Sequence, residues 1–402
     1  MSNKNVATRY IPIGLMLFAL FFGAGNLIFP ASMGQNSGVN VWYALIGFCI
    51  TGVGMPLLAV MAMGYSGCSD LQEAAGRAHP LYGLFFTIVA YLAIGPCFAI
   101  PRTGTVAFEI AVSPFMAKEH LELGLPIFLA VFFLISFWLS ASPQKLVDRI
   151  GKLLTPALVL TIVLLIVQSF ISPLGEPQAP TAAYATAVTA TVQGIIDGYN
   201  TLDAIAAFVF ATLVVNVVKE DCGITDPAEI TRQVYKSGIV AVALLAFIYI
   251  FIAKIGAESV PAVGMQSTGA PVLAESAKIL FGNAGAIILS IIVLLACLST
   301  AIGLITCCAA YFLKLTGRFT YIYWVTIFSI VSFLVGMFGL QTIIVSTIPV
   351  LMFIYPLAFL VCQVVFLLTS EILTQQLTAD RPGGGCPGQC RQARPLRLPL
   401  RS

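Results

Sequence analysis

About ten long apolar stretches follow one another along this chain, and each can cross roughly 30 Å of hydrocarbon as a helix. The composition agrees, because the chain is 59% hydrophobic and only 9% charged, roughly a third of the charge of a soluble domain. We therefore predict an all-α polytopic membrane protein with one transmembrane domain over residues 1–370. The expected spans are Tyr10 to Gly34, Val41 to Gly64, Leu81 to Val112, Leu123 to Leu139, Ile150 to Ile171, Thr186 to Val218, Val234 to Ile255, Asn283 to Leu313, Tyr321 to Phe338 and Thr342 to Leu368.

Lysine and arginine are distributed unevenly between the two sides of these spans. Cytoplasmic loops of membrane proteins collect Lys and Arg, and only Lys118, Lys254 and Lys278 fall in outer loops if the N terminus is inside. We therefore expect a multi-pass protein with a cytoplasmic N terminus. The first span is too long for the apolar core of a cleaved signal peptide. The inner segments hold Lys4, Arg9, Arg77, Lys145, Arg149, Lys152, Lys219, Arg232, Lys236, Lys314 and Arg318.

The first span is interrupted by Phe-Gly-Ala-Gly-Asn at residues 22–26. Non-helical backbone at bilayer depth survives only where it lines a protein or water cavity, and such breaks point to the binding site of a transporter. Asn26 is a good N-cap for an outer half-helix, whose free N–H groups would suit a carboxylate. Gly23 and Gly25 would let a ligand approach the backbone closely. The alternative is a simple kink or tight helix packing at small residues.

The sixth span is interrupted in the same way over Asp197 to Asp203. We expect Gly198, Tyr199 and Asn200 to break the helix and Thr201 to cap a new one that has Asp203 in its first turn. An acidic residue near mid-membrane costs roughly 2.5–3.5 kcal/mol on insertion scales, so it usually marks a site. The alternative for Asp203 is a partner for the helix dipole, worth about 0.3–1 kcal/mol at exposed sites.

The eighth span carries Ala296, Ser299 and Thr300 near its midpoint, on one helix face. Hydroxyl groups beside the free carbonyls of a broken helix are hard oxygen ligands, which fit sodium. Hydroxyls in membrane helices also bond their own backbone or a neighbouring helix, which is the alternative here.

Arg102 is a cation inside the third span. On the topology above it lies on the outer side of the breaks, as Asp197 does, so we predict that the two pair as a gate over the site. The alternative is that Arg102 reaches the outer interface and is solvated there.

The inventory of polar residues argues for a carrier. The chain has only two histidines, both in predicted loops, and it has no paired-cysteine motif or nucleophile elbow, so a membrane-embedded enzyme is the weaker class and no cofactor is expected. A channel needs a continuous polar path, whereas the polar residues here gather at one level.

The basic residues form no stripe, so no nucleic-acid partner is expected. Leu27, Ile28 and Phe208 near the breaks favour an aliphatic solute.

Three motifs resemble the bacterial branched-chain amino acid carriers of the BrnQ type: Phe22 to Pro30, Gly95 to Thr103 and Gly198 to Asp203. The resemblance implies a cation-coupled importer of leucine, isoleucine and valine in the bacterial cell (inner) membrane; a carrier for another small apolar solute is the alternative. It also implies the leucine-transporter-like fold, in which five spans and an inverted copy of five, here about 8–172 and 186–369, place the substrate between broken helices 1 and 6.

The two breaks and the resemblance together define the predicted site. Sodium and protons both remain open as the coupling ion. The predicted substrate-binding residues are Gly23, Ala24, Gly25, Asn26, Gly198, Tyr199, Asn200, Thr201 and Asp203. By similarity to the leucine-transporter pattern, a sodium would be held by Ala19, Phe22, Ala296, Ser299 and Thr300.

The C-terminal segment 374–402 is atypical, because residues 381–402 are mostly Arg, Pro, Gly and Cys without Lys, Asp or Glu. This composition matches neither a span nor a normal bacterial loop, and it indicates translation out of frame rather than a genuine basic tail. Carriers of the BrnQ type usually have two further spans beyond this point, which are not expected here.

Overall fold

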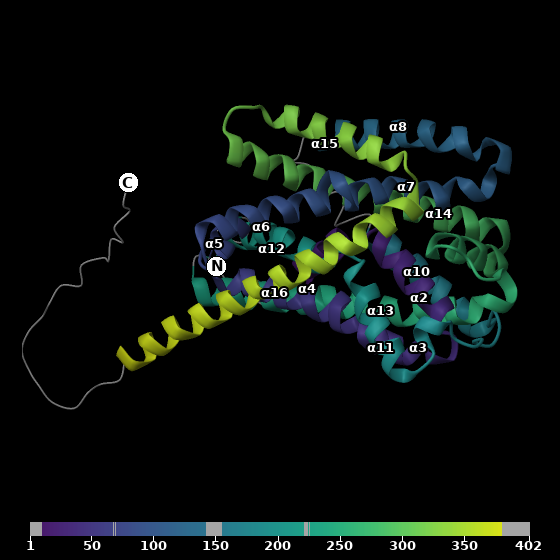
Figure 1. The fold of residues 1–402 in the computed structure, drawn as a ribbon, viewed down its shortest axis with the longest axis horizontal. Coiled ribbons are helices and arrows are strands. Elements are labelled where there is room, and N and C mark those ends of the chain that lie inside the picture. Colours follow the sequence, from purple (N-terminus) through teal and green to yellow (C-terminus); the bar gives the residue numbers. More distant parts are fainter. Residues whose placement is uncertain are drawn as a thin grey trace, which may run out of the picture.

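The computed structural model describes residues 10–66, 68, 70–141, 155–220, 224 and 226–379. Regular structure in this part of the chain is entirely helical, so the predicted all-α class is confirmed. Helices α8 (Leu121–Ser140) and α15 (Tyr321–Gly336) form an outer layer at the top of Figure 1, and the remaining helices pack below them. This layer lies against α7 (Ala99–Ala111) and α14 (Gly269–Thr316). The tail from residue 380 onward, including the segment interpreted as out of frame, lies outside the described residues.

The first half of the chain contains two breaks in its first and third spans and a π-helical turn in its second. Gly95 is the non-helical residue of the third span, between α6 and α7. The elements are α1 (Tyr10–Phe21), α2 (Ala24–Ser37), α3 (Val41–Cys49), the π turn η2 (Ile50–Gly54), α4 (Met55–Ser66), α5 (Leu71–Gly76), α6 (Pro80–Leu92), the π turn η3 (Ala93–Cys97), α7 (Ala99–Ala111), α8 (Leu121–Ser140) and α10 (Thr155–Ile171).

The second half begins after the 3₁₀ turn η8 (Ala182–Tyr184) and contains longer helices. These are α11 (Ala187–Tyr199), α12 (Asp203–Glu220), α13 (Pro227–Val263), α14 (Gly269–Thr316), α15 (Tyr321–Gly336) and α16 (Leu340–Ala379).

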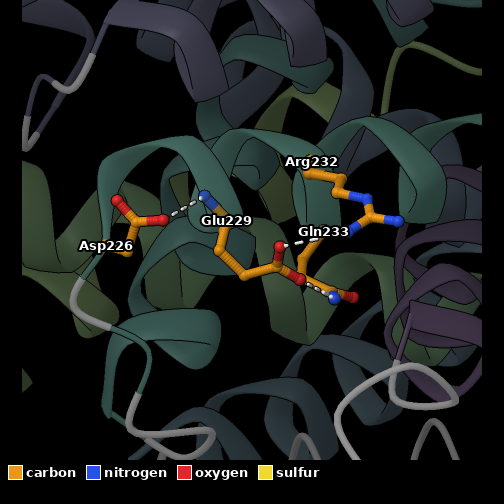
Figure 2. A network of polar contacts seen from close by, with 4 residues as sticks. All are labelled: Asp226, Glu229, Arg232 and Gln233. Carbon is orange, nitrogen blue, oxygen red and sulfur yellow. Dashed lines mark hydrogen bonds and ion pairs between the residues drawn. The ribbon is translucent and has the colours of Figure 1, made fainter.

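Helix α13 starts at a capped N-terminus, which Figure 2 shows. The carboxylate of Asp226 accepts a hydrogen bond from the Glu229 N–H at 3.3 Å. Gln233 then donates to the Glu229 side chain at 2.6 Å, and Arg232 lies 3.5 Å from the same carboxylate. An acidic N-cap satisfies one of the free N–H groups of the first turn.

Six described helical segments are long and apolar enough to cross a membrane, and the bent pair α11 and α12, which meet at 42°, counts as a further span. Helices α1 and α15 are shorter apolar segments, so the total of ten spans stays a prediction. Several boundaries differ from those expected. Helix α16 continues past Leu368, and α14 begins with an extra helix that Gly282, at φ +66°, separates from the eighth span.

Two pairs of helices approach so closely that only glycine fits between them. A Cβ on Gly194 of α11 would lie 2.0 Å from the carbonyl oxygen of Ala44 in α3, and a Cβ on Gly256 of α13 would lie 2.2 Å from that of Ala31 in α2. Small residues let membrane helices pack backbone to backbone. One half of each broken span, α2 in the first and α11 in the sixth, is therefore held against a neighbouring helix, which positions the two breaks.

We predict that Gly194→Ala destabilises the protein by about 1–3 kcal/mol, the usual cost of overpacking, because α3 and α11 must move apart. The measurement is the apparent Tm of detergent-purified protein. Gly54→Ala is the matched control inside a span, since the added Cβ would lie 3.7 Å from the Cys49 carbonyl oxygen of the same span and would meet no neighbouring helix within 4 Å. Equal Tm values for the two variants would contradict the close packing.

Candidate functional site

The break in the first span is shorter than expected and is capped differently. Helix α1 ends at Phe21 and α2 begins at Ala24, with Gly23 as its N-cap. Asn26 was predicted to be the N-cap, and this is wrong: it lies in the first turn of α2, and its Oδ1 reaches back to accept a hydrogen bond from the Gly23 N–H at 3.1 Å. The side chain therefore closes the turn from inside the helix and is almost fully buried.

The break in the sixth span covers Asn200, Thr201 and Leu202, while Gly198 and Tyr199 remain in α11. Leu202 takes a φ of +69°, a conformation that is strained for a residue with a side chain. The Thr201 hydroxyl donates to the Gly198 carbonyl at 2.9 Å and accepts from the Asp203 N–H at 3.4 Å. Thr201 thus joins the end of α11 to the first residue of α12.

The two breaks are joined by a buried cluster of three side chains. Asn26 Nδ2 donates to Asp203 Oδ2 at 2.5 Å and contacts the Tyr249 hydroxyl at 2.5 Å, and that hydroxyl donates to the same Asp203 oxygen at 2.9 Å. All three residues are buried. The structure thus brings Asn26 and Asp203 together, as two residues predicted for one site.

Tyr249 was not among the predicted site residues. It comes from the middle of α13, where it is the one hydroxyl within the apolar run Ala246 to Ala253. A lone tyrosine in an apolar span is an available signal, because a buried hydroxyl needs a hydrogen-bond partner. The identity of that partner, Asp203, follows only from the packing of α13 against α12.

Arg102 lies at the break of the sixth span and is 4% exposed. Its Nη1 donates to the carbonyl oxygen of Asn200 at 2.6 Å and its Nη2 to that of Thr201 at 2.9 Å. The guanidinium carbon is 5.1 Å from the centre of the Phe29 ring, a cation–π arrangement. The planar fork of arginine suits two adjacent acceptors, so this side chain satisfies carbonyls that the break leaves without helical partners.

The predicted pairing of Arg102 with Asp197 is not formed. Asp197 lies in the helical part of α11 and accepts hydrogen bonds from the Tyr184 hydroxyl and from Gln193, the latter at 3.4 Å. Burial and the neighbouring Asp197 carboxylate raise the pKa of Tyr184, so the phenol stays protonated and can donate. Arg102 is instead bound by the two adjacent carbonyls of Asn200 and Thr201, which the break leaves as acceptors for its planar fork.

The residues expected to hold sodium lie at the contact between α1 and α14. A Cβ on Gly23 would be 2.9 Å from Thr300 Oγ1, so Thr300 faces the first break. That hydroxyl is buried and has no hydrogen-bond partner within the described residues. Ser299 donates to the Ala296 carbonyl at 2.8 Å, which is the intrahelical bond expected of serine in a membrane helix. Ala19 and Phe22 are buried on the α1 side.

A small cavity of about 30 Å³ lies between the two breaks. It has room for a water molecule or two, so the site is closed around it. Its apolar wall is aliphatic and aromatic; Leu27, Ile28 and Phe208, which were predicted to surround the site, are buried elsewhere and do not line it. The apolar lining consists of Leu20, Phe21, Ala24, Ile94, Ala99, Leu202, Ala206, Phe210 and Leu304; Gly23 and Gly25 also line the cavity, and its polar lining consists of Asn26, Arg102, Thr103, Thr201, Asp203 and Thr300.

Residues 6–380 match the family model described as branched-chain amino acid transport protein. The chain belongs to this family. The transporter is 44% identical over 357 residues to the branched-chain amino acid permease BraB of Bacillus subtilis (strain 168), covering 89% of this chain and 79% of that protein. It is also 44% identical over 367 residues to the permease BrnQ of the same organism, covering 91% and 83%. Membership of a family of permeases agrees with the expectation of a carrier rather than an enzyme.

Solved structures with little sequence similarity share the fold of the transporter. MhsT in complex with L-phenylalanine has a TM-score of 0.55 at 19% identity, covering 82% of this chain and 80% of that one. Mhp1, a nucleobase-cation-symport-1 family transporter, has a TM-score of 0.59 at 17% identity, covering 88% and 77%. The leucine-transporter-like architecture with broken first and sixth spans is therefore confirmed.

We predict that Asp197 and Arg102 act independently, whereas Asp197 and Tyr184 are coupled. In double-mutant cycles on the apparent Tm of purified protein, Asp197→Asn and Tyr184→Phe should show a coupling of about 0.5–3 kcal/mol, as residues in contact do. Asp197→Asn and Arg102→Lys should be additive within about 0.5 kcal/mol. Strong coupling in the second cycle, with none in the first, would restore the predicted gate pair.

Proposed function

We propose that this transporter imports leucine, isoleucine and valine across the bacterial cell membrane, by alternating access and coupled to a cation. The observation that carries the proposal is the closed cavity between the two breaks, with polar groups on one side and aliphatic and aromatic side chains on the other. The names of the relatives BraB and BrnQ support the same class of substrate.

The apolar wall supports an aliphatic side chain on the substrate. Leu20, Ile94, Phe210 and Leu304 line the cavity, and burial of each methylene in such surroundings is worth about 0.8 kcal/mol. A leucine does not fit in about 30 Å³, so these side chains must separate when the substrate enters. Opening alternately to the two faces of the membrane is the movement that a carrier with one central site requires.

The polar wall supports recognition of an amino acid backbone. The first turn of α2 begins at the cavity and presents the N–H groups of Ala24 and Gly25 there, while the Gly23 N–H is taken by Asn26. The positive end of the helix dipole favours a carboxylate there. The excess of lysine and arginine on the inner segments supports the orientation with a cytoplasmic N terminus.

Coupling to sodium is supported by Thr300, whose buried hydroxyl has no partner in the described part of the chain and faces the first break. An unsatisfied buried hydroxyl costs free energy that a bound cation would recover. Ala19 lies in α1, Phe22 directly follows it in the first break, and Ala296 and Ser299 lie in α14 with Thr300. Protons are the second candidate for the coupling ion, because Asp203 is a buried carboxylate at the same site.

The substrate prediction is tested by competition for labelled leucine in proteoliposomes. Excess isoleucine or valine should abolish leucine uptake, whereas equal concentrations of lysine or glutamate should leave most of it, because a charged side chain would lose its hydration against an apolar wall. Competition by lysine or glutamate equal to that by isoleucine would refute an aliphatic pocket. Competition by small apolar solutes that are not amino acids would favour the alternative substrate class.

The ion prediction is tested with the double substitution Ser299→Ala and Thr300→Val. The sodium concentration for half-maximal leucine uptake should rise roughly tenfold or more, as expected when about 1.4 kcal/mol of ligand interaction is lost. Thr87→Val is the matched control, since Thr87 is also a buried threonine with an unpartnered hydroxyl among the described residues but lies in α6, outside the site. An unchanged sodium response in a well-expressed double variant would exclude these ligands, and uptake that follows only pH would indicate protons.

A further inference from the structure

We propose that Arg102 and Asp203 form a clamp for a zwitterion, in which Arg102 binds the carboxylate of the substrate and Asp203 binds its ammonium group. The inference rests on the proposed function, because it takes the substrate to be an amino acid. It goes further by assigning each charge of the substrate to one side chain, and it replaces the predicted role of Arg102 as a gate.

The first observation is that two opposite charges lie in the wall of one cavity without pairing. Arg102 comes from α7 and Asp203 from α12, both line the cavity, and they are 4% and 3% exposed. They interact electrostatically, yet no direct ion pair joins them in the described structure. A buried charge without an opposite charge in contact is costly. A molecule with one charge of each sign between them would satisfy both.

The second observation concerns the free donor of Arg102. Its two Nη atoms are occupied by the carbonyls of Asn200 and Thr201, but its Nε is buried and has no hydrogen-bond partner among the described residues. The guanidinium also lies against the first turn of α2, since a Cβ on Gly25 would be 2.7 Å from Nη2. A carboxylate at this point would accept from Nε and face the positive end of the α2 dipole, two features that favour the same charge.

The third observation concerns the charge on Asp203. The hydrogen bonds that it accepts from Asn26 and Tyr249 come from neutral donors, which orient the carboxylate and supply no positive charge. A substrate ammonium would supply the missing cation. Asp203 would also repel a carboxylate, so the substrate can bind in only one orientation, and its side chain then projects toward the apolar wall.

The clamp requires a ligand that carries both a carboxylate and an ammonium group. A site built to bind a charged group discriminates against analogues that lack it, since its own buried charge is then left unpaired. L-leucinamide keeps the ammonium of leucine and replaces the carboxylate by a neutral amide. 2-Hydroxy-4-methylpentanoate keeps the carboxylate and replaces the ammonium by a hydroxyl. Each analogue therefore tests one half of the clamp.

The experiment measures displacement of labelled leucine from the purified full chain in nanodiscs, for the wild type and for Arg102→Gln and Asp203→Asn. The wild type should bind leucine roughly 10- to 100-fold more tightly than either analogue, the range expected for a charge-assisted hydrogen bond. The Arg102→Gln variant should bind leucine no more tightly than leucinamide, but it should still bind leucine more tightly than the hydroxy acid. Asp203→Asn should show the reverse. Asp197→Asn, a half-buried acid of the same span that does not line the cavity, should keep both wild-type ratios.

Loss of affinity by the same factor for all three ligands, in both variants, would mean that the two side chains only support the fold, and the clamp would be overturned. If the variants do not fold, the wild type decides, because leucinamide or the hydroxy acid binding as tightly as leucine excludes the clamp directly. A wild type that binds another amino acid but no branched-chain one refutes the proposed function alone, and the clamp is then tested with the amide and hydroxy analogues of that amino acid. Binding of no amino acid overturns both.

Discussion

The structure depends on satisfying backbone groups that two broken helices expose in the middle of a membrane. No water is available there in lipid, so each free N–H or C=O must find a partner within the protein. Asn26 closes the first break from within α2, and Arg102 takes the carbonyls of Asn200 and Thr201 at the second. The side chains that stabilise the breaks are thus the same ones that surround the cavity.

The third span contributes to the site because it too is broken. Gly95 departs from helical geometry, with φ −87° and ψ −128°, and the thiol of Cys308 in α14 contacts the carbonyl of Tyr91 at 3.5 Å beside it. Helix α7 restarts at Ala99 after this turn, which carries Arg102 to the sixth-span break. A straight third helix would follow a different path, so the position of the Arg102 guanidinium depends on the turn at Gly95.

Close packing through glycine explains how such an interrupted core remains ordered. The half-helices α2 and α11 pack against α13 and α3 at backbone distance, through Gly256 and Gly194. Membrane helices gain little from the hydrophobic effect when they associate, so dense packing of this kind carries much of their stability. The same contacts hold Tyr249 of α13 where it meets Asp203, since α13 packs against both α2 and α12.

The sequence by itself determined the class of protein, the two principal breaks and most of the polar side chains around them, since long apolar runs and polar interruptions at bilayer depth have few physical solutions. It also indicated Thr300 and Asp203 as polar groups that a membrane interior needs to satisfy. Only the tertiary structure decided the partners. Arg102 was predicted to meet Asp197, and it binds carbonyls instead, because a break creates acceptors that no residue pattern displays. Tyr249 joins the site for a similar reason. The turn of α13 that meets Asp203 depends on how closely the glycine-lined helices approach one another, and that distance is a property of the packed molecule.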